Sequence, residues 1–199
     1  MRRTIGFIVV AIGILAYATL LLVAIPSLQL DDIEQSPKHI PSNAQIERGR
    51  EVYIEAGCLY CHSQQPTTLD FAPDLNRNWG RYAVPADYVG DHPHLLGTMR
   101  TGPDLHNIGA RQPSEDWHLI HLYQPRSVLP NSVMPSYQYL FTHVAKVPPG
   151  QKQVSVPEKW VPEGNKVIAS QDALDLVAYL QSLDHTYQVD EPKDAEKMP

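Results

Sequence analysis

The longest apolar segment of the sequence runs from Ile5 to Ile25 without a charged residue. As an α-helix with a rise of about 1.5 Å per residue, it would span roughly 30 Å, the thickness of a hydrocarbon core. A cleaved signal peptide is the alternative, but its apolar region has only about 7–15 residues and ends at a small-x-small site. The stretch Val23-Ala24-Ile25-Pro26 is a poor site of that kind. We therefore expect residues 1–27 to form a retained transmembrane anchor.

Charges on either side of this segment predict its orientation. Arg2 and Arg3 precede it, whereas Asp31, Asp32 and Glu34 follow it. Positive residues concentrate on the cytoplasmic side of membrane helices. The N-terminus should therefore be cytoplasmic, and the rest of this single-pass chain should lie on the outer side of the membrane.

Three shorter segments show the apolar periodicity of amphipathic helices. The first begins at Ala44 and is broken by Gly57, the second covers about Ser114 to Tyr123, and the third covers about Gln171 to Leu183. Ser170 is a good N-cap for the third helix. The apolar stripe of this last helix comprises Ala173, Leu176, Val177, Leu180 and Leu183.

The segments between these helices contain most of the 18 prolines of the chain and predict long loops. Residues 28–44 have no periodic apolar face and are interpreted as a linker, and residues 186–199 as a flexible polar tail. Residues 145–168 show no clear pattern. The expected fold is mainly α: an N-terminal transmembrane helix, then one domain over residues 45–185 with long proline-rich loops.

The formal net charge of the chain is -6, which bears on the class of macromolecule that it can bind. A negative protein is a poor ligand for nucleic acid, so we expect no nucleic-acid partner. The charge is compatible with docking to a basic patch on another protein.

The strongest chemical signal is the stretch Cys58-Leu59-Tyr60-Cys61-His62. Cys-x-x-Cys-His is the attachment motif of c-type haem, because two thiols on one turn can each add to a vinyl group of a single haem. The next residue then offers an imidazole nitrogen to the iron. A redox Cys-x-x-Cys or half of a zinc site are the alternatives, but no surrounding β-α-β pattern and no further closely spaced ligands support them. We expect one covalently bound haem c, with His62 as an axial metal ligand.

The haem motif and the apolar segment indicate the same compartment. In bacteria, haem is attached covalently on the outer side of the cytoplasmic membrane. We therefore expect the protein in the bacterial inner membrane, with its haem domain in the periplasm.

The second axial ligand should be a methionine if the protein transfers electrons, because Met/His ligation suits that task. Met134 lies between Pro130 and Pro135, which would stiffen an extended loop over the haem. Met99 is the second choice, and Met198 lies in the polar tail. Three histidines are also conceivable distal ligands, although packing or surface roles suit them better: His106, His118 and His121.

These features resemble class I cytochromes c, in which an N-terminal helix leads into the haem motif and a Gly-Pro pair follows. The resemblance implies that Pro103, in Gly102-Pro103-Asp104-Leu105-His106, gives its carbonyl to the second nitrogen of His62. It implies that Arg111 binds a haem propionate. It also implies that the N-terminal and C-terminal helices of the domain cross at a small set of residues: Gly49, Tyr53, Leu176 and Tyr179.

A narrower resemblance covers most of the chain. The sequence looks like the monohaem cytochrome c subunit, often called subunit II, of cbb-type (C-family) haem–copper oxidases. In that family a Met-Pro pair supplies the distal ligand, which implies Met134. One segment departs from the pattern, because after Gln64 the family usually continues with a methionine and an Arg-rich stretch, whereas this chain reads Gln65-Pro66-Thr67-Thr68-Leu69-Asp70. The matching strings include Gly49-Arg50-Glu51-Val52-Tyr53-Ile54, Asp91-His92-Pro93, Arg100-Thr101-Gly102-Pro103-Asp104-Leu105, Asp116-Trp117-His118 and Ser132-Val133-Met134-Pro135-Ser136-Tyr137.

The resemblance implies a non-catalytic electron-transfer subunit of a cytochrome c oxidase complex. Its partners would be the catalytic haem–copper subunit and a dihaem or soluble cytochrome c donor. An anchored monohaem subunit of a respiratory nitric oxide reductase has the same architecture and is the first alternative. A haem enzyme or gas sensor with a labile sixth ligand is the second, and a purely structural anchor is the third.

Overall fold

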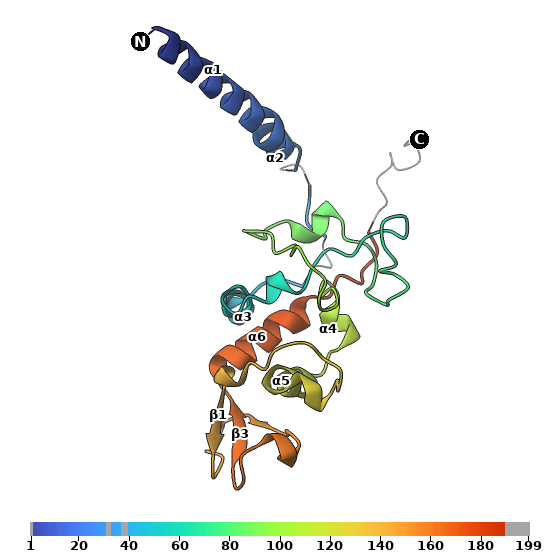
Figure 1. Ribbon diagram of the computed structural model, residues 1–199. Coiled ribbons are helices and arrows are strands. Elements are labelled where there is room, and N and C mark those ends of the chain that lie inside the picture. Colours follow the sequence, from blue (N-terminus) through green and yellow to red (C-terminus); the bar gives the residue numbers. More distant parts are fainter. Residues whose placement is uncertain (1, 31–32, 37–39, 190–199) are drawn as a thin grey trace. The chain divides into compact units, whose positions relative to one another are not determined.

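The computed structural model describes residues 2–30, 33–36 and 40–189 and divides into two units (Figure 1). The first unit comprises Met1–Ser36 with Val84–Asp91, and the second comprises Pro37–Ala83 with His92–Pro199. As predicted, the chain is mainly helical and has one N-terminal apolar helix.

The first unit is dominated by a helix that is long and apolar enough to cross a membrane, Arg3–Gln29, with 27 residues. It comprises α1 (Arg2–Thr19), the π-helical turn η1 (Leu20–Ala24) and α2 (Ile25–Leu30). The π turn precedes Pro26, which has no N–H to donate to the preceding turn. The Ile25 N–H instead donates to the Leu20 carbonyl, five residues back. The helix thus continues to Leu30, three residues beyond the expected end of the anchor at residue 27.

The same unit contains the short helix η3 (Pro85–Tyr88). Its start is fixed by the Asp87 carboxylate, which accepts a hydrogen bond of 2.9 Å from the Val84 N–H. The Gln35 side chain donates to the Val89 carbonyl at 2.8 Å. The expected linker, residues 28–44, begins in α2 and ends at α3, and its residues 31–32 and 37–39 lie outside the described part of the chain.

The second unit is built around two crossing helices, α3 (Ala44–Glu55) and α6 (Gln171–Ser182). A Cβ on Gly49 would lie 1.9 Å from the Asp175 carbonyl oxygen, so only glycine allows the two backbones to come this close. The Tyr53 and Tyr179 rings pack edge to face beside the crossing, with centroids 5.3 Å apart. Gly49, Tyr53 and Tyr179 of the predicted crossing set are therefore brought together, and Leu176 is fully buried.

Side-chain caps explain where these helices begin. The Asn43 carboxamide oxygen accepts from the N–H groups of Gln45 and Ile46 at the start of α3. Ser170 caps α6 as predicted, accepting from Ala173 N–H at 3.2 Å. Shorter helices complete the unit: η2 (Cys58–Tyr60), α4 (Ile108–Arg111), α5 (Glu115–Tyr123), η4 (Pro125–Ser127), η5 (Gln138–Leu140) and η6 (Glu158–Trp160).

A small antiparallel sheet was not predicted from the sequence. Its strands are β1 (Phe141–Val144), β2 (Gln153–Val154) and β3 (Lys166–Ala169), in the order β1-β3-β2. Val154 and Val167 are buried opposite each other across the β2–β3 pair. Lys152 ties the sheet to α5, because its ammonium group lies 2.7 Å from Glu115 and 2.8 Å from Asp116.

The packed part of the chain extends beyond residue 185, where the flexible tail was expected to begin. Tyr187 is buried, and its carbonyl accepts a hydrogen bond of 2.9 Å from Arg81 Nε. The Arg81 guanidinium also lies 4.7 Å from the centroid of the Tyr187 ring. Residues 190–199, which include most of the expected tail and Met198, lie outside the described residues.

Candidate haem site

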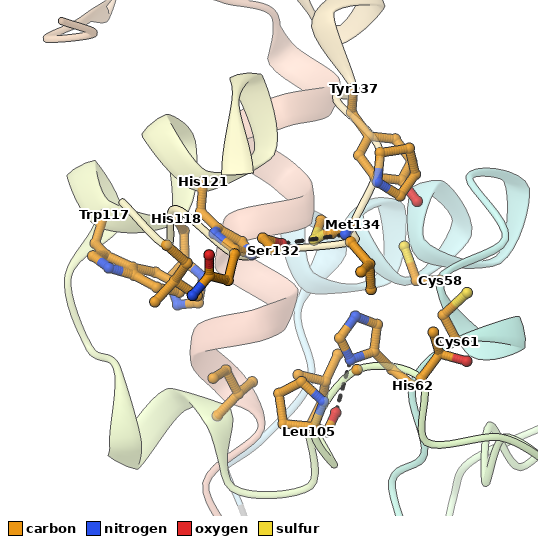
Figure 2. Close-up of a pocket in the computed structure, with 18 of the residues that line it drawn as sticks. Cys58, Cys61, His62, Leu105, Trp117, His118, His121, Ser132, Met134 and Tyr137 are labelled. Carbon is orange, nitrogen blue, oxygen red and sulfur yellow. Dashed lines mark hydrogen bonds between the residues drawn. The ribbon is translucent and has the colours of Figure 1, made fainter. Parts of the chain in front are cut away.

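The Cys-x-x-Cys-His motif directly follows α3. Gly57 has a φ of 72°, in the left-handed region that glycine adopts readily, and it ends the helix. The chain then forms the single turn η2, and the His62 N–H donates to the Cys58 carbonyl at 3.0 Å. Both thiols are free; Cys58 is buried and Cys61 is exposed. This turn places the two sulfurs and the imidazole at one wall of a cavity (Figure 2).

The His62 ring is oriented by the segment that contains the Gly-Pro pair. Its Nδ1 lies 2.7 Å from the Pro103 carbonyl oxygen, so Nδ1 carries the proton and donates it. That tautomer leaves the lone pair on Nε2. Gly102 is required here, because a Cβ would lie 2.2 Å from His62 Cε1. The hydrogen bond expected between Pro103 and His62 is therefore present.

The His62 imidazole is held in its neutral form. Burial lowers its pKa, opposed by the hydrogen bond to Pro103 and by the negative charge of Asp104. A metal-ligating histidine must be neutral, so the environment suits this side chain to coordinate iron.

The cavity has a volume of about 510 Å³, within the range of about 300–1,000 Å³ typical of small-molecule and cofactor sites. Figure 2 shows Met134 and His62 reaching into it from different segments. The hydrogen bonds that hold the Met134 loop include Met134 N–H to Ser132 Oγ at 3.2 Å and Tyr137 N–H to the Leu122 carbonyl at 2.9 Å. The lining residues include Cys58, Cys61, His62, Gly102, Pro103, Leu105, Ile108, Trp117, His118, His121, Leu129, Ser132, Val133, Met134, Pro135 and Tyr137.

The structure separates the methionines that the sequence offered as ligands. Met134 lines the cavity, whereas Met99 does not line it and is 57% exposed. His106 does not line the cavity either; its ring stacks on that of His185 with centroids 4.0 Å apart.

Helix α5 contributes a cluster to the cavity lining; His118 and His121 were conceivable distal ligands for which packing or surface roles were preferred, whereas Trp117 was not predicted at the site. Trp117 and His121 stack with centroids 4.6 Å apart, and His118 Nε2 lies 2.8 Å from the Gln112 carbonyl. Burial, followed by the neighbouring histidines His118 and His62, lowers the pKa of His121 to about 4. The i, i+4 spacing of Trp117 and His121 on a capped helix was the available signal.

Arg111, expected at a haem propionate, does not line the cavity. Its Nη2 donates to the Asp104 carbonyl, and its Nε is buried without a hydrogen-bond partner among the described residues. Burial lowers the pKa of this guanidinium. A buried donor without a partner is compatible with an acceptor supplied by a bound group, and the contact of Arg111 with a haem propionate stays a prediction.

The donor set of the cavity fits a c-type haem. Two thiols on one turn, a neutral imidazole with a free Nε2 lone pair and a thioether are all present, and the remaining lining is mostly apolar. Because Gly102 has no Cβ, the imidazole can lie directly against the backbone at this position. These groups would hold a haem c, the thiols through thioether links and the imidazole and thioether as candidate iron ligands.

Comparison with known proteins agrees with this chemistry. The family described as cytochrome c oxidase, mono-heme subunit/FixO, matches residues 1–173. A search of curated proteins found no significant match. Because the family match covers most of the chain, including the haem motif, Pro103 and Met134, the protein belongs to the FixO family of mono-haem cytochrome c oxidase subunits.

Proposed function

We propose that this chain relays single electrons from a cytochrome c donor to the catalytic subunit of a cbb-type oxidase. The observation that carries the proposal is that Met134 and His62 reach into one cavity whose wall contains Cys58 and Cys61. Haem c supplies a one-electron redox centre when it is bound there. The family match favours an oxidase over a nitric oxide reductase as the host complex.

Each residue of the site has a separate task in this proposal. Cys58 and Cys61 form the two thioether links, and His62 coordinates iron through Nε2. Pro103 fixes the imidazole plane through the 2.7 Å hydrogen bond and increases the basicity of the ring. Met134 would supply the second protein ligand, which would leave no open position for a substrate. A site filled on both sides suits electron transfer and not oxygen chemistry.

The surface around the cavity supports transfer to a partner. Cys61 is exposed, and Val133 lines the cavity while remaining 71% exposed, so the cavity reaches the molecular surface. Electrons would leave to a haem of the catalytic haem–copper subunit and arrive from a soluble or dihaem cytochrome c. The N-terminus would lie in the cytoplasm and the haem domain in the periplasm, within the respiratory chain of the inner membrane.

The proposed ligand set is tested with Met134→Ala, and with Met99→Leu as the matched control. We expect the ferric wild-type protein to show the long-wavelength charge-transfer band of thioether-ligated haem. Met134→Ala should lose this band and bind carbon monoxide in the ferrous state, whereas Met99→Leu should match the wild type. An unchanged band in Met134→Ala would overturn the assignment, and carbon monoxide binding by the wild type would favour a gas sensor.

A further inference from the structure

The Gly-Pro segment is fastened to the end of the haem motif and to Ser63, the residue that follows it. Gly102 N–H donates to the Cys61 carbonyl at 2.9 Å, and Leu105 N–H donates to the Ser63 carbonyl at 2.8 Å. Pro103, whose carbonyl holds His62, therefore lies between two backbone hydrogen bonds to the motif. A charged side chain in this segment therefore lies near the His62 imidazole and interacts with it electrostatically.

Asp104, the residue after Pro103, is such a charge. It is completely buried, and both carboxylate oxygens are engaged. Oδ1 accepts from His106 N–H at 2.8 Å, while Oδ2 accepts from Ser63 Oγ at 2.5 Å and from Gln65 N–H at 2.8 Å. A buried carboxylate is costly unless such donors satisfy it, so this one is specifically accommodated.

A single arginine links Asp104 to a second buried carboxylate. Arg100 Nε donates to Ser63 Oγ at 3.1 Å, and Ser63 in turn donates to Asp104. Arg100 Nη1 lies 2.9 Å from Asp74, which is also completely buried, and Nη2 donates to the Gln65 carbonyl at 2.8 Å. All three guanidinium nitrogens are thus used to join the haem motif to the loop around Asp74.

We propose that Asp104 and Arg100 are positioning residues that set the reduction potential of the site through opposite charges on the His62–Pro103 pair. The inference rests on the proposed function, because it requires His62 to coordinate the haem. Oxidised haem iron carries one more positive charge than reduced iron, and a buried anion nearby favours the oxidised form. Asp104 should therefore lower the potential, and Arg100 should raise it by partly neutralising Asp104.

A purely structural role for the network makes a different prediction. Loosening of the segment would expose the haem or weaken the His62–Pro103 hydrogen bond, whichever residue was replaced. The potentials of all such variants would then shift in one direction. Opposite shifts on removing the anion and the cation are specific to an electrostatic role.

The test measures midpoint potentials of the full-length, haem-loaded protein in detergent. We expect Asp104→Asn to raise the potential, Arg100→Gln to lower it, and Arg100→Lys to stay close to the wild type. Asp74→Asn should raise the potential by less than Asp104→Asn, because Asp74 is joined to Ser63 and Gln65 through Arg100 and does not itself adjoin Pro103. Should Asp104→Asn fail to fold, the opposite shifts of Asp74→Asn and Arg100→Gln still decide the question.

Asp175→Asn is the matched control, because Asp175 is buried and paired with Arg48, and none of its hydrogen bonds within the described part of the chain runs to His62, Pro103 or Asp104. Its potential should equal that of the wild type. Shifts of one sign in Asp104→Asn, Asp74→Asn and Arg100→Gln, or no shift beyond the control, would overturn the inference. A wild-type protein without covalent haem or without the Met134-dependent band would instead overturn the proposed function.

Discussion

Gly102 is the residue at which packing most directly controls the candidate ligand. Its missing side chain leaves the space that the His62 ring occupies, with a hypothetical Cβ only 2.2 Å from Cε1. We expect Gly102→Ala to displace the ring, break its hydrogen bond to Pro103 and destabilise the protein by about 1–3 kcal/mol, as is usual for overpacking. Denaturant unfolding and the ferric absorption spectrum would measure both effects.

Gly13→Ala is the matched control, because a Cβ at Gly13 has no heavy atom within 4 Å. This variant should keep the wild-type spectrum and stability. Equal behaviour of Gly102→Ala and Gly13→Ala would show that the close approach to His62 has no energetic consequence.

Among single residues, the haem motif could be predicted from the sequence, whereas the residues that surround it in the fold could be predicted only in part. Cys58, Cys61 and His62 follow from spacing on one turn, since their chemistry depends on residues close in the chain. Pro103 was implied by resemblance, and the hydrogen bond is present. Arg111 was implied in the same way; its guanidinium donates to the Asp104 carbonyl, and its contact with a haem propionate stays a prediction. Long-range placement of a flexible side chain depends on packing that spacing does not encode.

Among the elements, the crossing of α3 and α6 contains an ion pair whose effect on stability depends on pH. Arg48 Nε lies 2.6 Å from the Asp175 carboxylate, and Gln171 donates to the same carboxylate at 2.7 Å. Burial alone would raise the pKa of Asp175, but the hydrogen bonds from Arg48 and Gln171 outweigh it and lower the pKa. The ionised form therefore stabilises the folded state.

The direction of the shift in the Asp175 pKa determines the pH range in which the ion pair stabilises the folded state. A carboxyl group with a depressed folded pKa contributes stability above its unfolded pKa of about 3.9, and this contribution is lost as pH falls through the folded pKa. We expect Asp175→Asn to be less stable than the wild type at pH 7, with the difference shrinking below about pH 4. Denaturant unfolding of the full-length protein, followed by circular dichroism across this range, would measure it.

Gln171→Leu provides a companion measurement, because it removes one donor and retains the ion pair. It should weaken the pH dependence without abolishing it. A difference between wild type and Asp175→Asn that stays constant down to pH 3 would contradict the depressed pKa.

The helices were more predictable than the strands for a physical reason. Helix α6 combines an N-cap, a continuous apolar stripe and enough length for the pattern to be unambiguous. Strand β2 has only two residues and β1 and β3 have four each, too short for alternation to be recognised. Their pairing depends on contacts distant in sequence, such as Phe141 opposite Ala169. The sheet therefore emerges from tertiary packing and not from local pattern.

For the whole molecule, the presence of the apolar helix Arg3–Gln29 on the same chain as the haem domain predicts how electron transfer depends on protein concentration. If the helix is a retained anchor, the domain stays at the membrane surface near its electron acceptor. Tethering of this kind replaces a bimolecular encounter by an intramolecular one, with effective concentrations reaching the millimolar range for short linkers. Residues 31–43, between the two helices, are few enough for the linker to act in this way.

Replacing residues 1–30 with a cleavable secretion signal should therefore yield a water-soluble domain with unchanged haem content and spectrum. Oxidase activity in membranes containing the catalytic subunit but no anchored domain should become dependent on the concentration of this soluble form. Activity should be low in dilute mixtures and recover as the domain is added, whereas the anchored protein should show no such dependence. Equal activity of both forms at high dilution would mean that the helix contributes nothing to the relay. Mass spectrometry of the mature wild-type protein tests the anchor itself: a mass that lacks residues 1–30 would identify them as a cleaved signal.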